Sequence, residues 1–498
     1  MTTAGPGATE AAGAAPAREF RRALGLFDGT MLVIGSMIGS GIFIVSADIA
    51  RTVGSGGWLL AVWLVTGLMT VTGALAYGEL AGMMPHAGGQ YVYLRESYNP
   101  LTGFLYGWTF FLVIQTGTIA AVGVAFAKFT AVLIPSLGDS TVLFSAGPVR
   151  VTAQRLVAIL NVAVLTAVNT QGITGGKWIQ NVFTSAKTAA LAGLIALGLV
   201  AGASLGVFRA NLATFWDATT THASAGGAAA PVPLAGIALL GALGVAMVGS
   251  LFSSDAWNNV TFTAGETVNP RRNIPLSLAI GTGAVTVLYL LANVAYLAVL
   301  PVAGTPGAAD AAGRGIQFAA ADRVATAAMS VILGPAAAAV MAVLIMVSTF
   351  GCNNGLILSG ARVYYAMARD GVFFRSAGKL NAKGVPGAAL VVQCVWACLL
   401  CLSGTYADLL DYVIFAVLLF YILTVIGIFR LRRTGPGAER PYRAFGYPVL
   451  PALYVVAALA IAVDLLVLKP AYTWPGLGIV VLGIPAFFAW KATETPRS

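Results

Sequence analysis

The stretch that decides the fold reads GSMIGSGIF, residues 35–43, near the middle of the first long apolar segment. It places three glycines and two serines where an uninterrupted helix would carry larger side chains. Glycine costs about 1 kcal/mol relative to alanine inside a helix, so two interpretations stay open. Gly35 and Gly39 favour close packing against another helix. Alternatively, the helix unwinds here and exposes N–H and C=O groups, which a bilayer tolerates only inside protein or beside a cavity.

A second interruption lies in the sixth apolar segment, where residues 249–259 read GSLFSSDAWNN. Asp255 alone costs at least about 2.5 kcal/mol at the centre of a membrane helix, and a purely structural polar cluster between helices is the alternative. Interruptions in two corresponding segments are the best sequence indication of an inverted-repeat transporter site. Half-helix N-termini favour a carboxylate, and the carbonyl groups at half-helix C-termini favour an ammonium group. The two breaks together therefore fit a zwitterionic α-amino acid.

The composition places both stretches in a membrane. Of 498 residues, 58% are hydrophobic and 9% are charged, whereas soluble domains carry about 25% charged residues. This excludes a water-soluble enzyme, a disordered protein and a nucleic-acid-binding module, and a barrel would show alternating segments of about 10 residues. The third and eighth segments are longer than a bilayer requires, so tilt or extension into water is expected. We count twelve apolar segments, at about 28–50, 57–83, 101–134, 151–170, 178–206, 232–264, 274–300, 327–368, 385–403, 408–430, 446–468 and 474–491.

The basic residues indicate the orientation of these segments. With a cytoplasmic N-terminus, 19 of the 28 Lys and Arg residues fall in inside loops, 7 fall outside, and Lys128 and Lys187 lie within segments. Basic residues collect in cytoplasmic loops, so the net charge of +10 needs no nucleic acid. We expect an all-α, twelve-helix protein of the cell (plasma or inner) membrane, in contact with lipid and with both termini cytoplasmic. Residues 1–22 are expected to form a disordered cytoplasmic tail.

Histidine and cysteine do not form a recognisable catalytic or metal site. His86 and His222 fall in expected loops, and all four cysteines, at 352, 394, 398 and 401, lie in apolar segments. We therefore expect no catalytic residue, metal or cofactor, and no structural disulfide. The chain also has no G-x-x-x-x-G-K-[ST] loop for ATP, so the energy source is expected to be a gradient or a counter-substrate.

Several motifs, in order and spacing, resemble the amino acid–polyamine–organocation (APC) superfamily. GSGIF at 39–43 resembles its first-span signature, and AYGEL at 76–80 followed by GGQYVYL at 88–94 resembles its second span and first internal loop. Within the superfamily the sequence is most similar to the L-amino-acid transporter branch. The residues that carry this likeness are GETVNPRRNIP at 265–275, STFGCNNG at 348–355 and RPYR at 440–443. The resemblance extends through most of residues 25–450.

This resemblance implies two inverted five-helix repeats, residues 23–206 and 232–434, with discontinuous helices 1 and 6 and two additional helices in residues 444–491. It also implies alternating access of an amino acid. Backbone groups of the first break would line the subsite for the α-carboxylate and α-amine; these are Met37, Ile38, Gly39, Ser40 and Gly41. Phe252 and Ser253 would add carbonyl groups, with the Phe252 ring as an outer gate. Asp255, Trp257 and Asn258 would shape the side-chain pocket.

Two departures from the resemblance affect partners and specificity. Members of the branch that bond a partner glycoprotein use an external cysteine, and the loop at 135–150 has none. A disulfide-linked heavy chain is therefore not expected. The acidic pair usual after the sixth span is here Gly265-Glu266, and Ser254-Asp255 is more polar than usual, which changes the expected side-chain preference.

Two charges inside the expected segments are candidates for coupling. The resemblance places Lys187 where sodium-coupled relatives bind a cation, and its ammonium group is expected to bond to carbonyl groups of the first segment and to Ser348 or Thr349. Sodium-independent transport coupled to closure would follow, with a static structural lysine as the alternative. Asp255 would take up a proton, attract a cationic side chain, or cap the broken helix. Glu79 and Glu266 are expected to be gate or loop ion-pair partners.

The function expected from all of this is secondary transport of an amino acid, with a neutral L-amino acid as substrate. Transport would be sodium-independent and would proceed by exchange or proton coupling. A cationic amino acid or polyamine is the alternative substrate, motivated by Asp255. A membrane sensor that binds without transporting is a different class, but its soluble signalling domain would need a longer non-membrane stretch than this chain offers.

Overall fold

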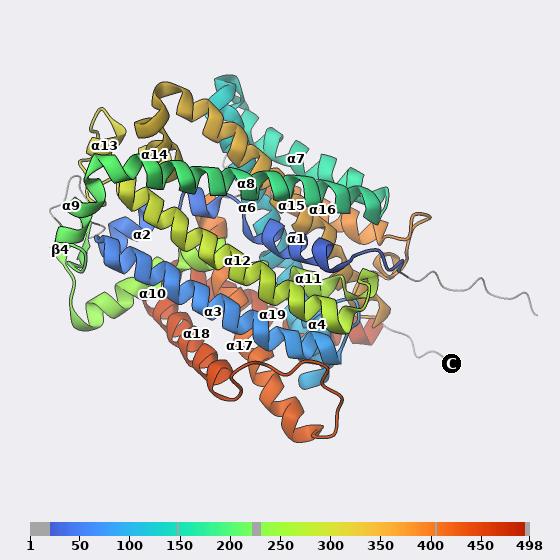
Figure 1. Ribbon diagram of the computed structural model, residues 1–498. Helices are drawn as coiled ribbons and strands as arrows, with labels where there is room; N and C mark the ends of the chain where they lie inside the picture. The colour runs from blue at the N-terminus through green and yellow to red at the C-terminus, as the bar shows by residue number, and fades with distance from the viewer. Residues whose placement is uncertain (1–19, 147–148, 222–230, 404–405, 494–498) are drawn as a thin grey trace, which may run out of the picture.

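The computed structural model describes residues 20–146, 149–221, 231–403 and 406–493. Most of the expected tail at 1–22 lies outside the described residues, as does His222. The described chain is mostly helical, and Figure 1 shows long helices packed side by side along the molecule. At the front of Figure 1, α12 packs against α3 on one side and against α8 on the other.

The helices of the first half follow the expected apolar segments closely, with short helices added between them. The added α4 lies in the loop after α3, and α9 follows α8. Their bounds are α1 (Leu26–Met37), α2 (Ser46–Val53), α3 (Gly56–Met83), α4 (Gln90–Ser97), α5 (Pro100–Thr109), α6 (Gln115–Leu133), α7 (Ala153–Thr170), α8 (Ile173–Leu205) and α9 (Val207–Ala213).

The second half repeats this mixture of long and short helices. Their bounds are α10 (Gly236–Ser253), α11 (Asn259–Phe262), α12 (Pro270–Val299), α13 (Ala311–Arg314), α14 (Val324–Leu333), α15 (Ala337–Arg369), α16 (Gly387–Ser403), α17 (Tyr406–Thr434), α18 (Val449–Leu468) and α19 (Pro470–Thr493).

Local sequence explains where several of these helices begin and end. Asn99 accepts a hydrogen bond from the backbone N–H of Thr102 and precedes Pro100 at the first turn of α5, a strong start signal. Gly334 adopts φ +67° directly before Pro335, so α14 ends there and α15 begins as a separate helix. The two helices still form one long apolar run, Val324–Arg369, which covers the expected eighth segment at 327–368.

The third expected segment also contains an irregularity. Residues Phe110–Ile114 form a π-helical turn between α5 and α6. Such turns are rare and occur frequently at functional sites. The axis remains continuous enough that Pro100–Leu133 counts as one apolar helical run of 34 residues.

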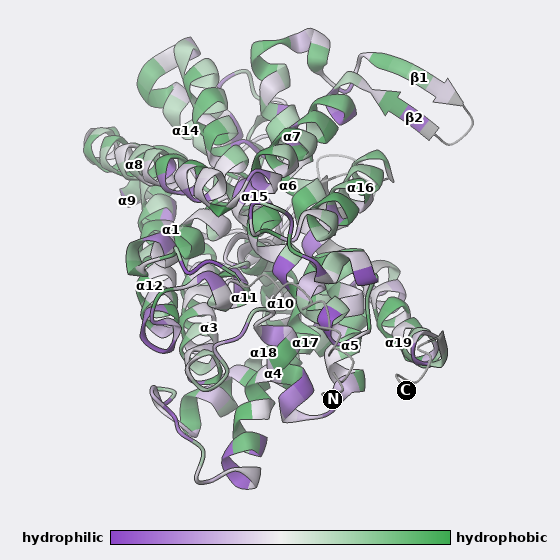
Figure 2. Ribbon diagram, turned by 90° about the vertical axis from the view of Figure 1, so that its right-hand side faces the viewer, coloured by the Kyte–Doolittle hydropathy of each residue, from purple (hydrophilic) through white to green (hydrophobic). Residues whose placement is uncertain are grey.

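Two small antiparallel strand pairs depart from the expected all-α fold. Strands β1 (Val142–Ala146) and β2 (Val149–Thr152) form a hairpin between α6 and α7, and Figure 2 shows it projecting away from the helices. Strands β3 (Thr219–Thr220) and β4 (Val232–Pro233) pair between α9 and α10. Alternation in these short loop segments was too brief to be recognised in the sequence.

The described residues include ten helical runs that are long and apolar enough to cross a membrane. Two shorter apolar helices, Leu26–Met37 and Gly387–Leu402, add to them. The outer faces of the helices are largely apolar, as the colouring of Figure 2 shows, and side chains such as Val200, Ile237 and Leu240 are exposed there. A lipid environment accounts for such faces, so the chain is a multi-pass helical membrane protein.

Candidate functional site

The first break begins where α1 ends at Met37. Ile38 is extended, with ψ 93°, and a 3-10 turn at Gly41–Phe43 leads into α2. Unwinding frees carbonyl groups that a continuous helix would use, and neighbouring helices take them up. The Ser348 hydroxyl lies 2.9 Å from the Gly39 carbonyl oxygen and 3.2 Å from that of Ile38. The break is therefore a true interruption rather than a close helix packing alone.

Lys187 on α8 holds this break from one side. Its ammonium nitrogen donates to the carbonyl oxygens of Gly35 and Ile38, each at 2.6 Å, and to that of Ser348 at 3.2 Å. The side chain is 1% exposed, so the charge is compensated entirely by these dipoles within its described surroundings. Thr349 does not take part, because its hydroxyl bonds to the carbonyl groups of its own helix at Ile345 and Met346.

The second break follows Ser253, the last residue of α10. Residues 254–258 are irregular, and Ala256 has φ +64°, a conformation that L-residues other than Asn and Asp rarely adopt. Helix α11 then begins after Asn258, with no side-chain cap. Asp255 therefore does not cap α11.

The two breaks meet. A Cβ atom on Gly41 would lie 2.0 Å from the Ser253 hydroxyl oxygen and 3.1 Å from the Ser253 Cα, so only glycine fits there. The hydroxyl of Tyr289 on α12 lies 3.0 Å from the carbonyl oxygens of both Met37 and Ser253. One side chain thus bridges the ends of α1 and α10. Sequence reasoning missed Tyr289, because nothing in the apolar pattern of α12 marks it.

A small cavity, the break cavity, lies between the breaks. Ile38 does not line it, because its carbonyl group is turned toward Lys187. Trp257 and Asn258 also lie outside it and line neighbouring cavities. The predicted residues that do line it are Met37, Gly39, Ser40, Gly41, Phe252, Ser253 and Asp255, with Ser36, Thr118 and Cys352 among the additions.

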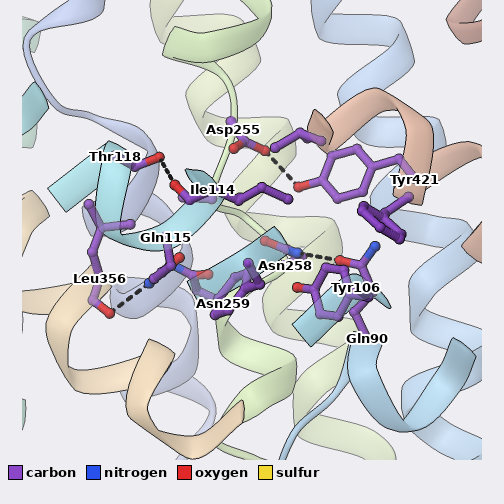
Figure 3. A pocket seen from close by; sticks show the side chains of 14 residues that line it. Gln90, Tyr106, Ile114, Gln115, Thr118, Asp255, Asn258, Asn259, Leu356 and Tyr421 are labelled. Atoms are coloured by element: carbon purple, nitrogen blue, oxygen red, sulfur yellow. Dashed lines mark hydrogen bonds between the residues drawn. The ribbon is translucent and has the colours of Figure 1, made fainter. Parts of the chain in front are cut away.

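Asp255 lies where three cavities adjoin. It lines the break cavity and two further cavities, the Asn258 cavity and one that Trp257 lines. Its side chain is 9% exposed, and the Tyr421 hydroxyl of α17 donates to it at 2.6 Å, as Figure 3 shows. Trp257 packs edge-on against Tyr77, with ring centroids 4.8 Å apart, and contacts Tyr421. Trp257 is thus a wall of the third cavity.

Asn258 belongs to a polar chain at the other end of the site. Its amide nitrogen donates to the Gln90 side-chain oxygen at 2.9 Å, and the Gln90 amide nitrogen donates to the Thr424 hydroxyl at 3.0 Å. Figure 3 shows Asn258 and Gln90 together at the edge of the Asn258 cavity. Gln90 stood in the quoted GGQYVYL motif but was not predicted as a site residue, since a loop position gives no indication of this contact.

Ion pairs lie at both ends of the molecule. At the end that carries α4 and α11, Arg362 of α15 donates twice to the Glu266 carboxylate, both at 2.8 Å, with side chains 1% and 2% exposed. Arg432 makes the same two-point contact with Glu79, at 2.9 and 2.7 Å. At the opposite end, Arg51 of α2 donates to Asp322 at 2.7 Å and to the Gln317 carbonyl oxygen at 2.8 Å. Glu79 and Glu266 are therefore ion-pair partners, as their predicted role required.

Two interrupted helices enclose a cavity, and ion pairs lie at both ends of the molecule. This arrangement defines a membrane transporter and not an enzyme. The chain belongs to the amino acid permease family, whose family model matches residues 24–487. It is 27% identical over 455 residues to the mouse b(0,+)-type amino acid transporter 1 (Mus musculus), covering 91% of this chain and 84% of that protein. It is 29% identical over 469 residues to the human large neutral amino acids transporter small subunit 2 (Homo sapiens), covering 94% and 80%.

Proposed function

We propose that this permease carries a neutral L-amino acid by alternating access, without sodium, in exchange for another amino acid or together with a proton. The observation that carries the proposal is the cavity between the two breaks, which is lined by backbone on one side and by Asp255 on the other. The Lys187 ammonium group occupies the space beside the first break. A fixed positive charge there replaces a transported cation.

The substrate backbone would lie along the breaks. The leading N–H groups of the turn at Gly41–Phe43 lack intrahelical partners and favour the α-carboxylate. The α-ammonium group would face the carbonyl groups of Phe252 and Ser253, at the C-terminal end of α10. The Phe252 carbonyl oxygen already accepts from the Asp255 N–H at 3.2 Å, and that of Ser253 accepts from Tyr289, but each oxygen has a second lone pair to offer. The ring of Phe252 would close the cavity as an outer gate.

The topology in the membrane is part of the same proposal. The ten long apolar helical runs among the described residues would be joined by the two shorter apolar helices to make twelve spans. Residues 23–206 and 232–434 would form inverted repeats with discontinuous helices 1 and 6, and residues 444–491 would add two helices. Both termini would be cytoplasmic in the cell membrane, which places the Glu266–Arg362 pair inside.

No disulfide-linked heavy chain is proposed for this permease, although one group of relatives is named as small subunits. Cys352 and Cys401 are buried, and Cys394 and Cys398 are half-buried on α16. A non-reducing gel of the protein from its native membrane tests this: a band that shifts on reduction contradicts it.

A cationic amino acid or polyamine is the second candidate substrate. The observation that favours it is the buried Asp255 carboxylate, which faces three cavities and accepts a hydrogen bond from neutral Tyr421. A substrate ammonium or guanidinium group would supply the compensating charge.

Uptake by the purified protein in liposomes tests the proposal. Vesicles are loaded with or without each candidate amino acid and assayed under imposed pH or sodium gradients. We expect uptake that is indifferent to sodium and that needs either internal amino acid, which indicates exchange, or an inward proton gradient. Absence of uptake under every condition contradicts a transport function.

A further inference from the structure

The Asn258 cavity differs from the break cavity in its walls. It shares Thr118, Asp255 and Ala256 with the break cavity, so the two cavities adjoin at these residues. Side chains rather than backbone line its far part, and many of them are amides: Gln90, Gln115, Asn258 and Asn259. Figure 3 shows these amides around one part of the cavity, with Asp255 and Tyr421 at another.

Two polar groups in this wall have no hydrogen-bond partner among the described residues. They are the Tyr106 hydroxyl of α5 and the amide nitrogen of Asn259 at the start of α11. Both residues are almost fully buried, at 2% and 1% exposed. The other polar side chains of the wall are engaged: Gln115 donates to the Leu356 carbonyl oxygen at 2.7 Å, and Thr118 to that of Ile114 at 2.7 Å. An unsatisfied buried donor is costly, so a ligand that supplies an acceptor would be favoured in this cavity.

The charges around the cavity decide which acceptor fits. A carboxylate end group would satisfy Tyr106 and Asn259 but would be repelled by Asp255. A cationic end group would suit Asp255 but would meet donor hydrogens from Asn259. An aliphatic end group leaves both donors unsatisfied. A carboxamide satisfies all of them, because its oxygen accepts from Asn259 and Tyr106 while its NH₂ group donates to the Asp255 carboxylate.

We propose that this cavity receives the side chain of the transported amino acid and that Tyr106 and Asn259 select a side chain ending in a carboxamide, as in glutamine. The inference rests on the proposed amino-acid transport and narrows its substrate class. Tyr106 and Asn259 are specificity-determining residues that bind the substrate end group directly, while the breaks bind its backbone.

Competition for uptake tests the proposal. The assay measures the concentrations of unlabelled glutamine and of unlabelled leucine that halve uptake of labelled leucine into liposomes. Wild-type protein is expected to bind glutamine more tightly than leucine. Tyr106→Phe and Asn259→Leu should each weaken competition by glutamine about fivefold to tenfold relative to leucine, because each removes one donor.

Tyr364→Phe is the matched control. The Tyr364 hydroxyl is likewise buried without a partner among the described residues, but the ring packs against Phe110 and Phe373 and does not line this cavity. The ratio of glutamine to leucine should not change in this variant. Thermal melting of each variant shows whether a loss comes from misfolding, and Tyr106→Phe retains the buried ring.

The two proposals fail in different ways. If no amino acid is taken up by the wild type, the transport function itself is wrong. If leucine is taken up but neither Tyr106→Phe nor Asn259→Leu changes the ratio, carboxamide selection is wrong and transport stands. Stronger competition by glutamate or arginine than by glutamine in the wild type also overturns the selection.

Discussion

Lys187 is a buried charge. Three carbonyl oxygens, two from the first break region and one from α15, surround its ammonium nitrogen. Lys187→Ala leaves those carbonyl groups without their donor, and bonds to charged groups contribute about 1.5–3 kcal/mol each. We expect uptake in sodium-free buffer to fall at least about tenfold. Lys128→Ala is the control, because Lys128 contacts a single carbonyl oxygen at 3.4 Å. Wild-type uptake by Lys187→Ala would rule out a coupling role.

Asp255 is the other charge placed at the site, and its carboxylate faces three cavities. Asp255→Asn keeps the shape and the acceptor for Tyr421 but removes the charge. We expect uptake by this variant to vary less with external pH, or arginine to lose its ability to compete. The first result identifies a proton carrier and the second a cation subsite. A variant with unchanged pH dependence and unchanged arginine competition contradicts both roles.

The crossing of the two broken helices depends on one glycine. Gly41→Ala places a methyl group against the side chain and backbone of Ser253, and overpacking of this kind costs about 1–3 kcal/mol. We expect a lower melting temperature in detergent and a loss of uptake, since the breaks are pushed apart. Gly193→Ala is the control, because a Cβ at Gly193 meets nothing within 4 Å. Equal melting temperatures for the two variants would show that the crossing has room to spare.

The sequence predicted the breaks well and their surroundings less well, for a physical reason. Glycine, serine and aspartate inside an apolar run violate a local rule, so GSMIGSGIF and GSLFSSDAWNN are visible without a structure. Tyr289, Tyr421 and Tyr106 violate no local rule. The roles of their hydroxyl groups depend on tertiary contacts. Tyr421 bonds to Asp255 and Tyr289 bonds to Met37, and the two residues of each pair are more than 100 positions apart in the sequence. Pairing across that distance is set by tertiary packing and leaves no local pattern.

Ion pairs between different helices lie at both ends of the molecule. At one end Arg51 contacts Asp322 and the Gln317 carbonyl group. At the other end lies the buried Glu266–Arg362 pair. In the alternating access that we propose, one set of contacts would break while the other persists.

Arg51→Ala should favour the state open at its own end. Cys352, which lines the break cavity, reports this opening in a variant whose other three cysteines are serine. We expect a membrane-impermeant thiol reagent applied from that end to label Cys352 about fivefold faster. Arg314→Ala serves as the control, because Arg314 bonds only to backbone oxygens of its own loop among the described contacts. Unchanged labelling in Arg51→Ala would mean that this pair does not limit opening.

The π turn at Phe110–Ile114 has a consequence for how such a protein changes its cargo. A π turn carries one more residue than the α turn it replaces. In a uniform helix that extra residue would rotate everything that follows by about 100°, and the wider turn absorbs it. Phe110 at the start of the turn and Gln115 and Thr118 after it line the same cavity. Deletion of a single codon within the turn would therefore restore a uniform helix and leave Gln115 and Thr118 facing this cavity. Evolution could thus reshape the wall of the cavity, and so the choice of substrate, by the loss of three nucleotides with the rest of the bundle unaltered.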